Sequence, residues 1–361
     1  MGKSSILNKG HKMEELLRSY FLKSGYYVVR GVPFIYEGFD ITDIDVWLYG
    51  RPSSVSREIT IVDVKNKKTP QAIERIFWIQ GLKLAIKATN AVVATKDNRQ
   101  EVKDFGKDLG ILVLDGSFLA KLDKFDASNV QRLGEEDFLN QIDTYTFSKL
   151  DGDWRGRIRT CKSLLAKGLS FDNCNEWLTH GNFFVQQVIV NPNQREIALR
   201  CLYLICSFLA IAVDYSLREL SFLDQQERVT LIKDGFTYGS KGSIGLKKIL
   251  NVAMGLVEQH AKDGVTISQQ VRSSVNDHLD SLNTLILGEF FARNDVAKTL
   301  FNVAKELEDL AMKREFLVHT SASVELRSLL ACLLDYWAID RVLFSDQLKD
   351  FQANSASTES F

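Results

Sequence analysis

The chain has 361 residues, of which 45% are hydrophobic and only 4 are Pro, so it is long enough for two domains and favours helices. The formal net charge is −1, which excludes a strongly basic or acidic protein. The charge is unevenly distributed. Residues 1–125 carry 14 Lys and 6 Arg against 15 Asp and Glu, a net charge of +5, and the remainder carries −6. The N-terminal part is therefore the half expected to face a polyanion.

The cysteines and the apolar runs argue against several other classes of protein. The five Cys residues are odd in number and include no Cys-x-x-Cys pair, and the start of the chain does not resemble a signal peptide, so we expect a reducing cytoplasm. No His lies at ligand spacing from a Cys pair, so a zinc site is not expected. The longest apolar run, 201–213, is too short to span a bilayer, so it predicts a buried helix and no membrane partner.

Helical and strand patterns alternate over the first 125 residues. The expected elements are a helix at 13–21 closed by Gly25, a strand at 26–30 with 33–36 as its continuation or a second short strand, a β-hairpin at 43–65 with its loop at 50–54, a helix starting at Thr69 and Pro70, a strand at 91–94, a helix at 98–109 and a strand at 111–114. This order predicts an α/β domain with a mixed sheet flanked by helices.

The hairpin carries charged residues where a buried strand normally has none. Asp45 lies near the start of its first strand, and Asp63 and Lys65 lie at the end of the second. Residues i and i+2 of a strand share a face, so Asp63 and Lys65 point the same way, and pairing can bring Asp45 alongside. Burying such groups costs several kcal/mol unless they are paired or bind a metal. An Asp63–Lys65 ion pair is the simpler explanation and a metal site the functional one.

Three motifs resemble those of a known nuclease family. They are M-E-E-L-L-R-S-Y-F-L-K-S-G-Y in the first helix, I-D-V and I-V-D-V-K in the hairpin, and V-V-A-T followed by G-I-L-V-L-D-G-S-F-L-A-K-L. In this order they resemble the PD-(D/E)xK nuclease superfamily, and within it the catalytic domain of Mrr-like restriction endonucleases. The resemblance covers about the first third of the chain and implies a restriction-endonuclease-like fold. The Gly-rich segment that often precedes the Asp is missing here, and the motif carboxylate is Asp.

The resemblance implies roles for four residues. Asp45 and Asp63 match the metal-binding carboxylates, and Lys65 matches the Lys of the motif. Glu14 matches the carboxylate of the first helix, which is also implied to bind metal. Lys65 would orient the attacking water or stabilise charge on the phosphate.

Other features of this site stay open. Glu15 and Asp43 are alternatives to the neighbouring carboxylates, and Gln80 is either a site residue or a helix-surface amide. Oxygen ligands suit Mg²⁺, for which Mn²⁺ is expected to substitute. The implied activity is hydrolysis of DNA phosphodiester bonds in prokaryotic restriction or anti-phage defence. A homo-oligomer is expected, because cutting both strands usually takes two active sites.

The second half of the chain is predicted to be almost wholly helical. Residues 126–150 are expected to form a connector, 151–345 an all-helical bundle domain, and 346–361 a disordered tail. Helices are expected at 154–167, 195–213, 246–260, 268–287, 295–312 and 323–344.

One motif in this half, K-R-E-F-L-V-H-T-S, contains Arg314 and His319. It resembles the R-x(4–6)-H motif of HEPN domains, although Glu315 departs from the residues usual after the Arg. The resemblance implies RNA binding or metal-free RNA cleavage, with His319 as acid or base and Arg314 stabilising charge. A surface Arg–Glu pair and an ordinary His are the simpler explanation. A second hypothesis therefore makes the N-terminal domain a catalytically inert nucleic-acid-binding platform and the helical half the functional part.

Overall fold

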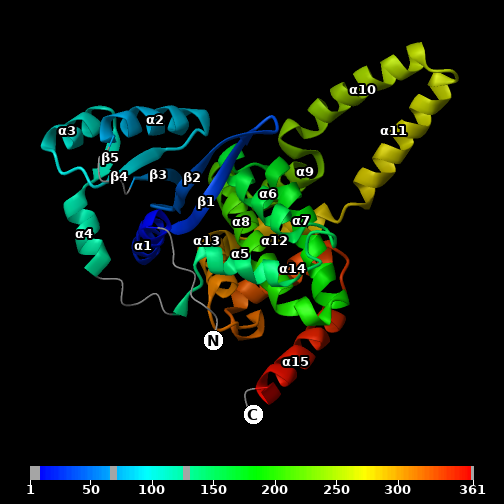
Figure 1. The fold of residues 1–361 in the computed structure, drawn as a ribbon. Helices are drawn as coiled ribbons and strands as arrows, with labels where there is room; N and C mark the ends of the chain where they lie inside the picture. The colour runs from blue at the N-terminus through cyan, green and yellow to red at the C-terminus, as the bar shows by residue number, and fades with distance from the viewer. Residues whose placement is uncertain (1–8, 66–70, 125–130, 359–361) are drawn as a thin grey trace.

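The computed structural model describes residues 9–65, 71–124 and 131–358. Its N-terminal part is a five-stranded sheet in the order β1-β2-β3-β4-β5 (Figure 1). Pairs β1–β2 and β2–β3 are antiparallel, and pairs β3–β4 and β4–β5 are parallel. The strands are β1 (Tyr27–Tyr36), β2 (Phe39–Gly50), β3 (Glu58–Lys65), β4 (Asn90–Thr95) and β5 (Ile111–Leu114).

Helices cover both faces of this sheet (Figure 1). Val46, Val62 and Val92 pack on α1 (Lys9–Lys23) and α4 (Gly116–Lys124). On the other face, Ile61 and Val93 pack on α2 (Ala72–Ala85) and α3 (Gln100–Asp108). The predicted α/β architecture with a mixed sheet is thereby confirmed. Its central strands carry apolar side chains on both faces, so helices must cover both faces.

The structure settles one alternative of the first half, and one predicted detail lies outside the described residues. Residues 33–36 continue the strand predicted at 26–30, so both segments form the single strand β1, which Glu37 and Gly38, both with positive φ, connect tightly to β2. Thr69 and Pro70, the predicted helix start, lie outside the described residues, and α2 begins at Ala72.

The second half is helical, as predicted. The helices are α5 (Glu135–Thr144), α6 (Trp154–Lys167), α7 (Phe171–Val190), α8 (Arg195–Leu220), α9 (Gln225–Tyr238), α10 (Gly242–His260), α11 (Gly264–Ser281), α12 (Thr284–Phe291), α13 (Asn294–Met312), α14 (Val324–Tyr336) and α15 (Arg341–Thr358). Helix α8 lies in the middle, packed between α7 and α13. The sequence patterns did not predict α5, α7 or α9.

Two predicted helices are each divided in two, which corrects the expected bounds. The segment 268–287 breaks between α11 and α12, where the chain returns to the body of the protein. The segment 323–344 breaks between α14 and α15. There the Trp337 indole packs against Gly181 of α7 and donates to the Leu178 carbonyl at 3.1 Å, and Ala338 adopts a φ of 54°. The second break thus follows from docking on α7.

The range predicted to be a disordered tail, 346–361, is helical as far as Thr358, and residues 359–361 lie outside the described residues. Phe344 and Leu348 are buried and anchor the start of α15. The polar composition of this range predicted disorder because it offers little apolar surface to bury. The prediction was wrong because Phe344 and Leu348 bury their side chains and hold the first turns of α15 on the protein.

One face of the sheet shares its hydrophobic core with the helical half, whereas the face under α1 and α4 has a core of its own. Trp47 and Tyr49 of β2 are fully buried in the same cluster as α8 and α13. Phe138 and Ile142 of α5, which lies in the range predicted as a connector, belong to it too. A hydrogen bond of 2.6 Å also joins Tyr27 Oη to Ser207 Oγ. The helical half is therefore packed firmly against β1 and β2.

One helical stretch, Pro192–Leu220, has the length and apolar composition of a membrane span. However, 89% of its most apolar window is buried inside the protein. Such burial is typical of a core helix, and it agrees with the buried helix predicted at 201–213.

Candidate active site

Asp45 and Asp63 come together where β2 and β3 diverge. The last pair of the two strands at this end is Val46 and Val62, and the two aspartates are the next residues beyond it. Asp45 Oδ2 accepts a hydrogen bond of 2.6 Å from the backbone N–H of Val64. The strand pairing thus places both carboxylates at one end of the hairpin, as the sequence predicts.

The backbone next to Asp45 is specialised. Strands β1 and β2 pair on both sides of Gly31 and Asp45, but these two residues do not pair with each other. Gly31 adopts a φ of +57°, which an L side chain rarely tolerates, and a Cβ there would lie 3.7 Å from Lys162 Nζ. This interruption of the ladder leaves Asp45 free to turn toward β3.

Asp63 is bound by two cations. Arg75 of α2 donates from Nε to Asp63 Oδ2 at 2.8 Å and from Nη2 to Asp63 Oδ1. Lys65 Nζ lies 3.8 Å from Asp63 Oδ1, so the ion pair suggested by their i, i+2 spacing exists as a longer contact. The Arg75 guanidinium also lies 5.5 Å from the centre of the Trp78 ring. Arg75 was not predicted as a site residue, because its only sequence signal is its place in the helix after the motif.

The electrostatics of Asp45 reflect this arrangement. Burial, together with the negative charge of Asp63, raises the pKa of Asp45 to about 7. The Val64 amide and Lys65 oppose the rise, and Glu14 adds to it. Two carboxylates that repel one another in a partly buried site are stabilised by a cation between them.

The structure distinguishes between Glu14 and Glu15. Glu15 is buried and accepts from Arg18 at 2.9 Å and from the Glu135 backbone N–H at 3.1 Å, so it faces α5. Glu14 accepts from Arg30 Nε at 2.8 Å and acts on the pKa of Asp45. Glu14 is thus the helix carboxylate within electrostatic reach of Asp45, and Arg30 holds it.

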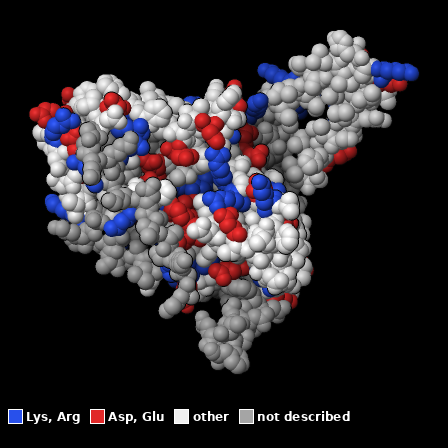
Figure 2. Space-filling model, in the orientation of Figure 1, with Lys and Arg blue, Asp and Glu red and all other residues white. Residues whose placement is uncertain are grey.

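Asp43 is directed elsewhere. It lines a groove between β2 and α6 together with Arg159 and Lys162. These cations already have partners, since Arg159 pairs with Asp40 at 2.9 Å and Lys162 with Glu135 at 2.6 Å. Figure 2 shows blue and red side chains intermixed in the middle of this face, over α6. The groove therefore offers no single sign of charge to a ligand.

The donor set fits Mg²⁺ through two carboxylates. Among the described residues, no three His, Cys, Asp or Glu are grouped closely enough to hold a metal ion. Mg²⁺ needs fewer, because it takes one or two protein carboxylates and keeps several waters. Asp45 Oδ1 makes no hydrogen bond within the described part of the chain. Asp45 and Asp63 therefore fit the ion, whereas the predicted metal-binding role of Glu14 stays a prediction.

Gln80 lies in the same helix as Arg75. Its Oε1 is buried and has no hydrogen-bond partner within the described residues. An unsatisfied buried amide oxygen costs about 1–3 kcal/mol, so its position calls for a partner such as water. Gln80 as a whole is partly exposed, and its role in the site stays a prediction.

Arg314 and His319 have different neighbours. Arg314 is exposed and pairs with Asp137 of α5 at 3.1 Å. His319 is largely buried, and its Nδ1 lies 2.8 Å from Tyr203 Oη, which also accepts from the His319 backbone N–H at 3.1 Å. The ring of Phe344 stacks on His319. Arg314 thus binds α5, whereas His319 binds α8.

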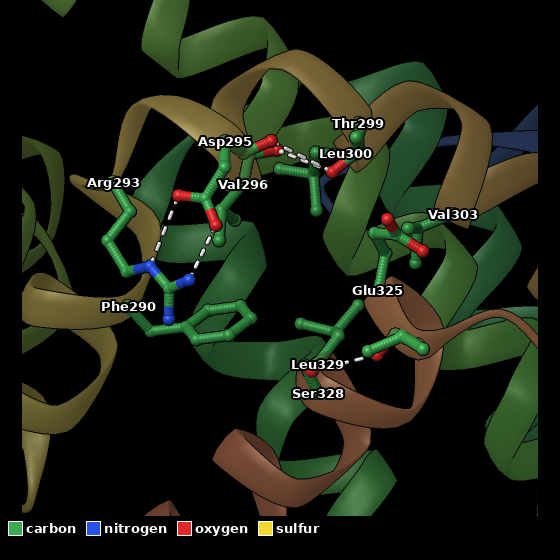
Figure 3. Close-up of a pocket in the computed structure, with 11 residues that line it drawn as sticks. Phe290, Arg293, Asp295, Val296, Thr299, Leu300, Val303, Glu325, Ser328 and Leu329 are labelled. Atoms are coloured by element: carbon green, nitrogen blue, oxygen red, sulfur yellow. Dashed lines mark hydrogen bonds and ion pairs between the residues drawn. The ribbon is translucent and has the colours of Figure 1, made fainter.

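A separate pocket of about 160 Å³ lies between α13 and α14 (Figure 3). Arg293 and Asp295 pair with one another at its rim, and Leu300 and Leu329 contribute apolar walls. Ser328 Oγ donates to the Val324 carbonyl at 2.8 Å. The pocket is smaller than the roughly 300–1,000 Å³ of typical ligand sites, and its Arg293, Asp295 and Ser328 side chains already have partners.

Comparison with known proteins identifies no relative, since no protein-family model, curated protein or solved structure matches the chain.

Proposed function

We propose that the chain is a Mg²⁺-dependent endonuclease that hydrolyses DNA phosphodiester bonds, with a restriction-endonuclease-like N-terminal domain. The carrying observation is the meeting of Asp45 and Asp63 at one end of the β2–β3 hairpin, with Lys65 Nζ 3.8 Å from Asp63. The motif order of the first third supports DNA as the substrate, as well as a cytoplasmic role in restriction or anti-phage defence, by analogy.

Each residue of the site has a separate proposed role. Asp45 and Asp63 would hold Mg²⁺, which when bound supplies positive charge for the phosphate and an activated water. Lys65, about one-third exposed, is placed to orient that water or to stabilise charge that develops on the phosphate. Glu14, held by Arg30, adds negative charge near Asp45 and so favours a cation there.

The alternative, an inert platform joined to an RNA-cleaving helical half, has less support. Asp45, Asp63 and Lys65 are all present and adjacent, whereas Arg314 and His319 contact different helices. RNA cleavage by the HEPN-like motif would need both side chains at one phosphate.

Plasmid cleavage tests the proposed function. We expect wild-type protein to cut DNA only with Mg²⁺ or Mn²⁺, and Asp63→Ala and Lys65→Ala to lower the rate by at least about 100-fold. Asp63→Ala removes a proposed ligand of the Mg²⁺, and Lys65→Ala removes a positive charge beside the reacting phosphate. Glu58→Ala, at the opposite end of β3, serves as the control and should retain activity. Metal-independent cleavage, or activity that survives both substitutions, would contradict the proposal. RNA cleavage that is lost in His319→Ala would then favour the helical half.

A second prediction concerns Arg75, which binds both oxygens of Asp63 and thus competes with a metal for them. Arg75→Gln should tighten Mg²⁺ binding in the absence of DNA about tenfold, because a charge-assisted pair worth roughly 1.5–3 kcal/mol no longer has to be broken. Titration calorimetry measures this affinity.

Arg99→Gln is the matched control, because it removes a similar two-point pair, with Asp97, that does not involve Asp63. It should leave the Mg²⁺ affinity unchanged. Equal or weaker binding by Arg75→Gln would show that Arg75 does not compete with the ion.

A further inference from the structure

Helices α10 and α11 form an arm that projects from the body of the protein (Figure 1). Within the described chain, α11 packs mainly on α10, and α10 packs on α11, α9 and the short turn Gly239–Lys241. The arm is therefore attached to the body at one end only, and most of its length has no neighbour in the chain.

The arm is a well-formed hairpin and not a pair of loose helices. Met254, Gly264 and Ser268 are buried between its helices. A Cβ on Gly264 would lie 2.3 Å from the carbonyl oxygen of Val257, so only glycine permits this close approach at the tip. Arg272 Nη1 donates to Asn251 Oδ1 at 2.6 Å and adds a link between the helices.

The arm also exposes many large apolar side chains. They are Ile244, Ile249, Val252 and Leu256 of α10, and Val265, Ile267 and Val271 of α11. Val252 is 68% exposed and Leu256 is 55% exposed. Ile249, Val252 and Leu256 follow i, i+3, i+7 spacing, which places them on one face of α10. A row of this kind in water marks an interaction surface rather than scattered surface residues.

We propose that the arm is a dimerisation element that packs against the arm of a second copy of this chain to form a four-helix bundle. Two-helix hairpins with an apolar face commonly close into such bundles. Helices of 19 and 18 residues are about 28 Å long, and two helices side by side, each about 10 Å wide, span about 20 Å. Each arm therefore presents a face of roughly 600 Å². This is close to the ~800 Å² per partner of a stable interface.

The charges on the arm favour a second copy over an unrelated partner. Lys247 and Lys248 lie in the first half of α10, and Asp277 and Asp280 lie in the second half of α11, so both pairs are at the end joined to the body. No salt bridge of the described structure joins them to each other. In a two-fold pair with the joined ends together, α10 of one arm lies along α11 of the other, which sets lysines opposite aspartates.

The arm carries none of the proposed nuclease residues, so dimerisation and DNA cleavage can fail independently. Light scattering after size exclusion should give wild-type protein twice the chain mass of 40.9 kDa. The double variant Val252→Glu, Leu256→Glu should give the mass of one chain with an unchanged circular-dichroism spectrum. Gln269→Glu, Ser273→Glu, at exposed polar positions of α11 with the same i, i+4 spacing, is the matched control and should remain dimeric.

Charge reversal adds an independent readout that does not depend on apolar packing. Lys247→Glu, Lys248→Glu should weaken the dimer, and adding Asp277→Lys, Asp280→Lys should restore it. A monomeric wild type at high micromolar concentration would overturn the proposal, as would a dimer that survives both the apolar double variant and the charge reversal.

Discussion

Asp214→Ala is expected to lower the free energy of unfolding by about 3–5 kcal/mol, the cost of removing one partner from a buried ion pair. Asp214 of α8 has no exposed surface. It accepts from Tyr49 Oη at 2.6 Å, from Arg51 Nη1 at 2.9 Å and from Arg57 Nε at 2.6 Å. The substitution would leave the buried Arg57 guanidinium and the Arg51 guanidinium without their shared carboxylate. Urea unfolding followed by circular dichroism measures the change.

Glu219→Ala is the control, because Glu219 lies near the end of the same helix, is 72% exposed and pairs with Arg218 on the surface. It should change the free energy by no more than about 0.5 kcal/mol. A loss below about 1 kcal/mol for Asp214→Ala would contradict the predicted cost. Because Asp214 joins the β2–β3 loop to α8, we also expect wild-type protein to unfold in one transition that includes both halves.

His319 should make the protein sensitive to mild acid. Burial, with a smaller effect from the charge of Arg327, lowers the pKa of His319 to about 4 from its ordinary 6.5. A depressed pKa means that the unfolded chain binds the proton more readily. The stability from neutral His319 is therefore fully present above pH 6.5 and is lost as the pH falls toward 4. The difference amounts to roughly 3 kcal/mol.

The measurement is the free energy of unfolding between pH 7.5 and 4, for wild type and for His319→Gln. The wild type should lose roughly 3 kcal/mol more than the variant over this range, since the variant has no proton to take up at this position. His260→Gln, at the exposed end of α10, is the matched control and should follow the wild type. Parallel curves for wild type and His319→Gln would show that His319 is accessible in the folded protein.

The amino-acid sequence by itself determined the local elements and the residue types of the site. The bounds predicted for α6 and β5 agree with the structure, because apolar spacing and β-branched runs are local signals. The position of Asp63 and Lys65 on one strand face follows from the two-residue period of a strand. The coarse architecture, a mixed sheet followed by helices, follows from the order of these elements.

Only the tertiary structure decided which side chains meet. Arg30 in β1 bonds Glu14 and Glu15 of α1 and also Glu136, more than 100 residues away. The bond between Arg75 and Asp63 depends on how α2 docks on the sheet. His319 is buried because Tyr203 and Phe344 meet there from distant helices. Sequence periodicity carries no information about such contacts. Each contact depends on how two elements pack together, and their separation along the chain does not determine how far apart they lie in the folded protein.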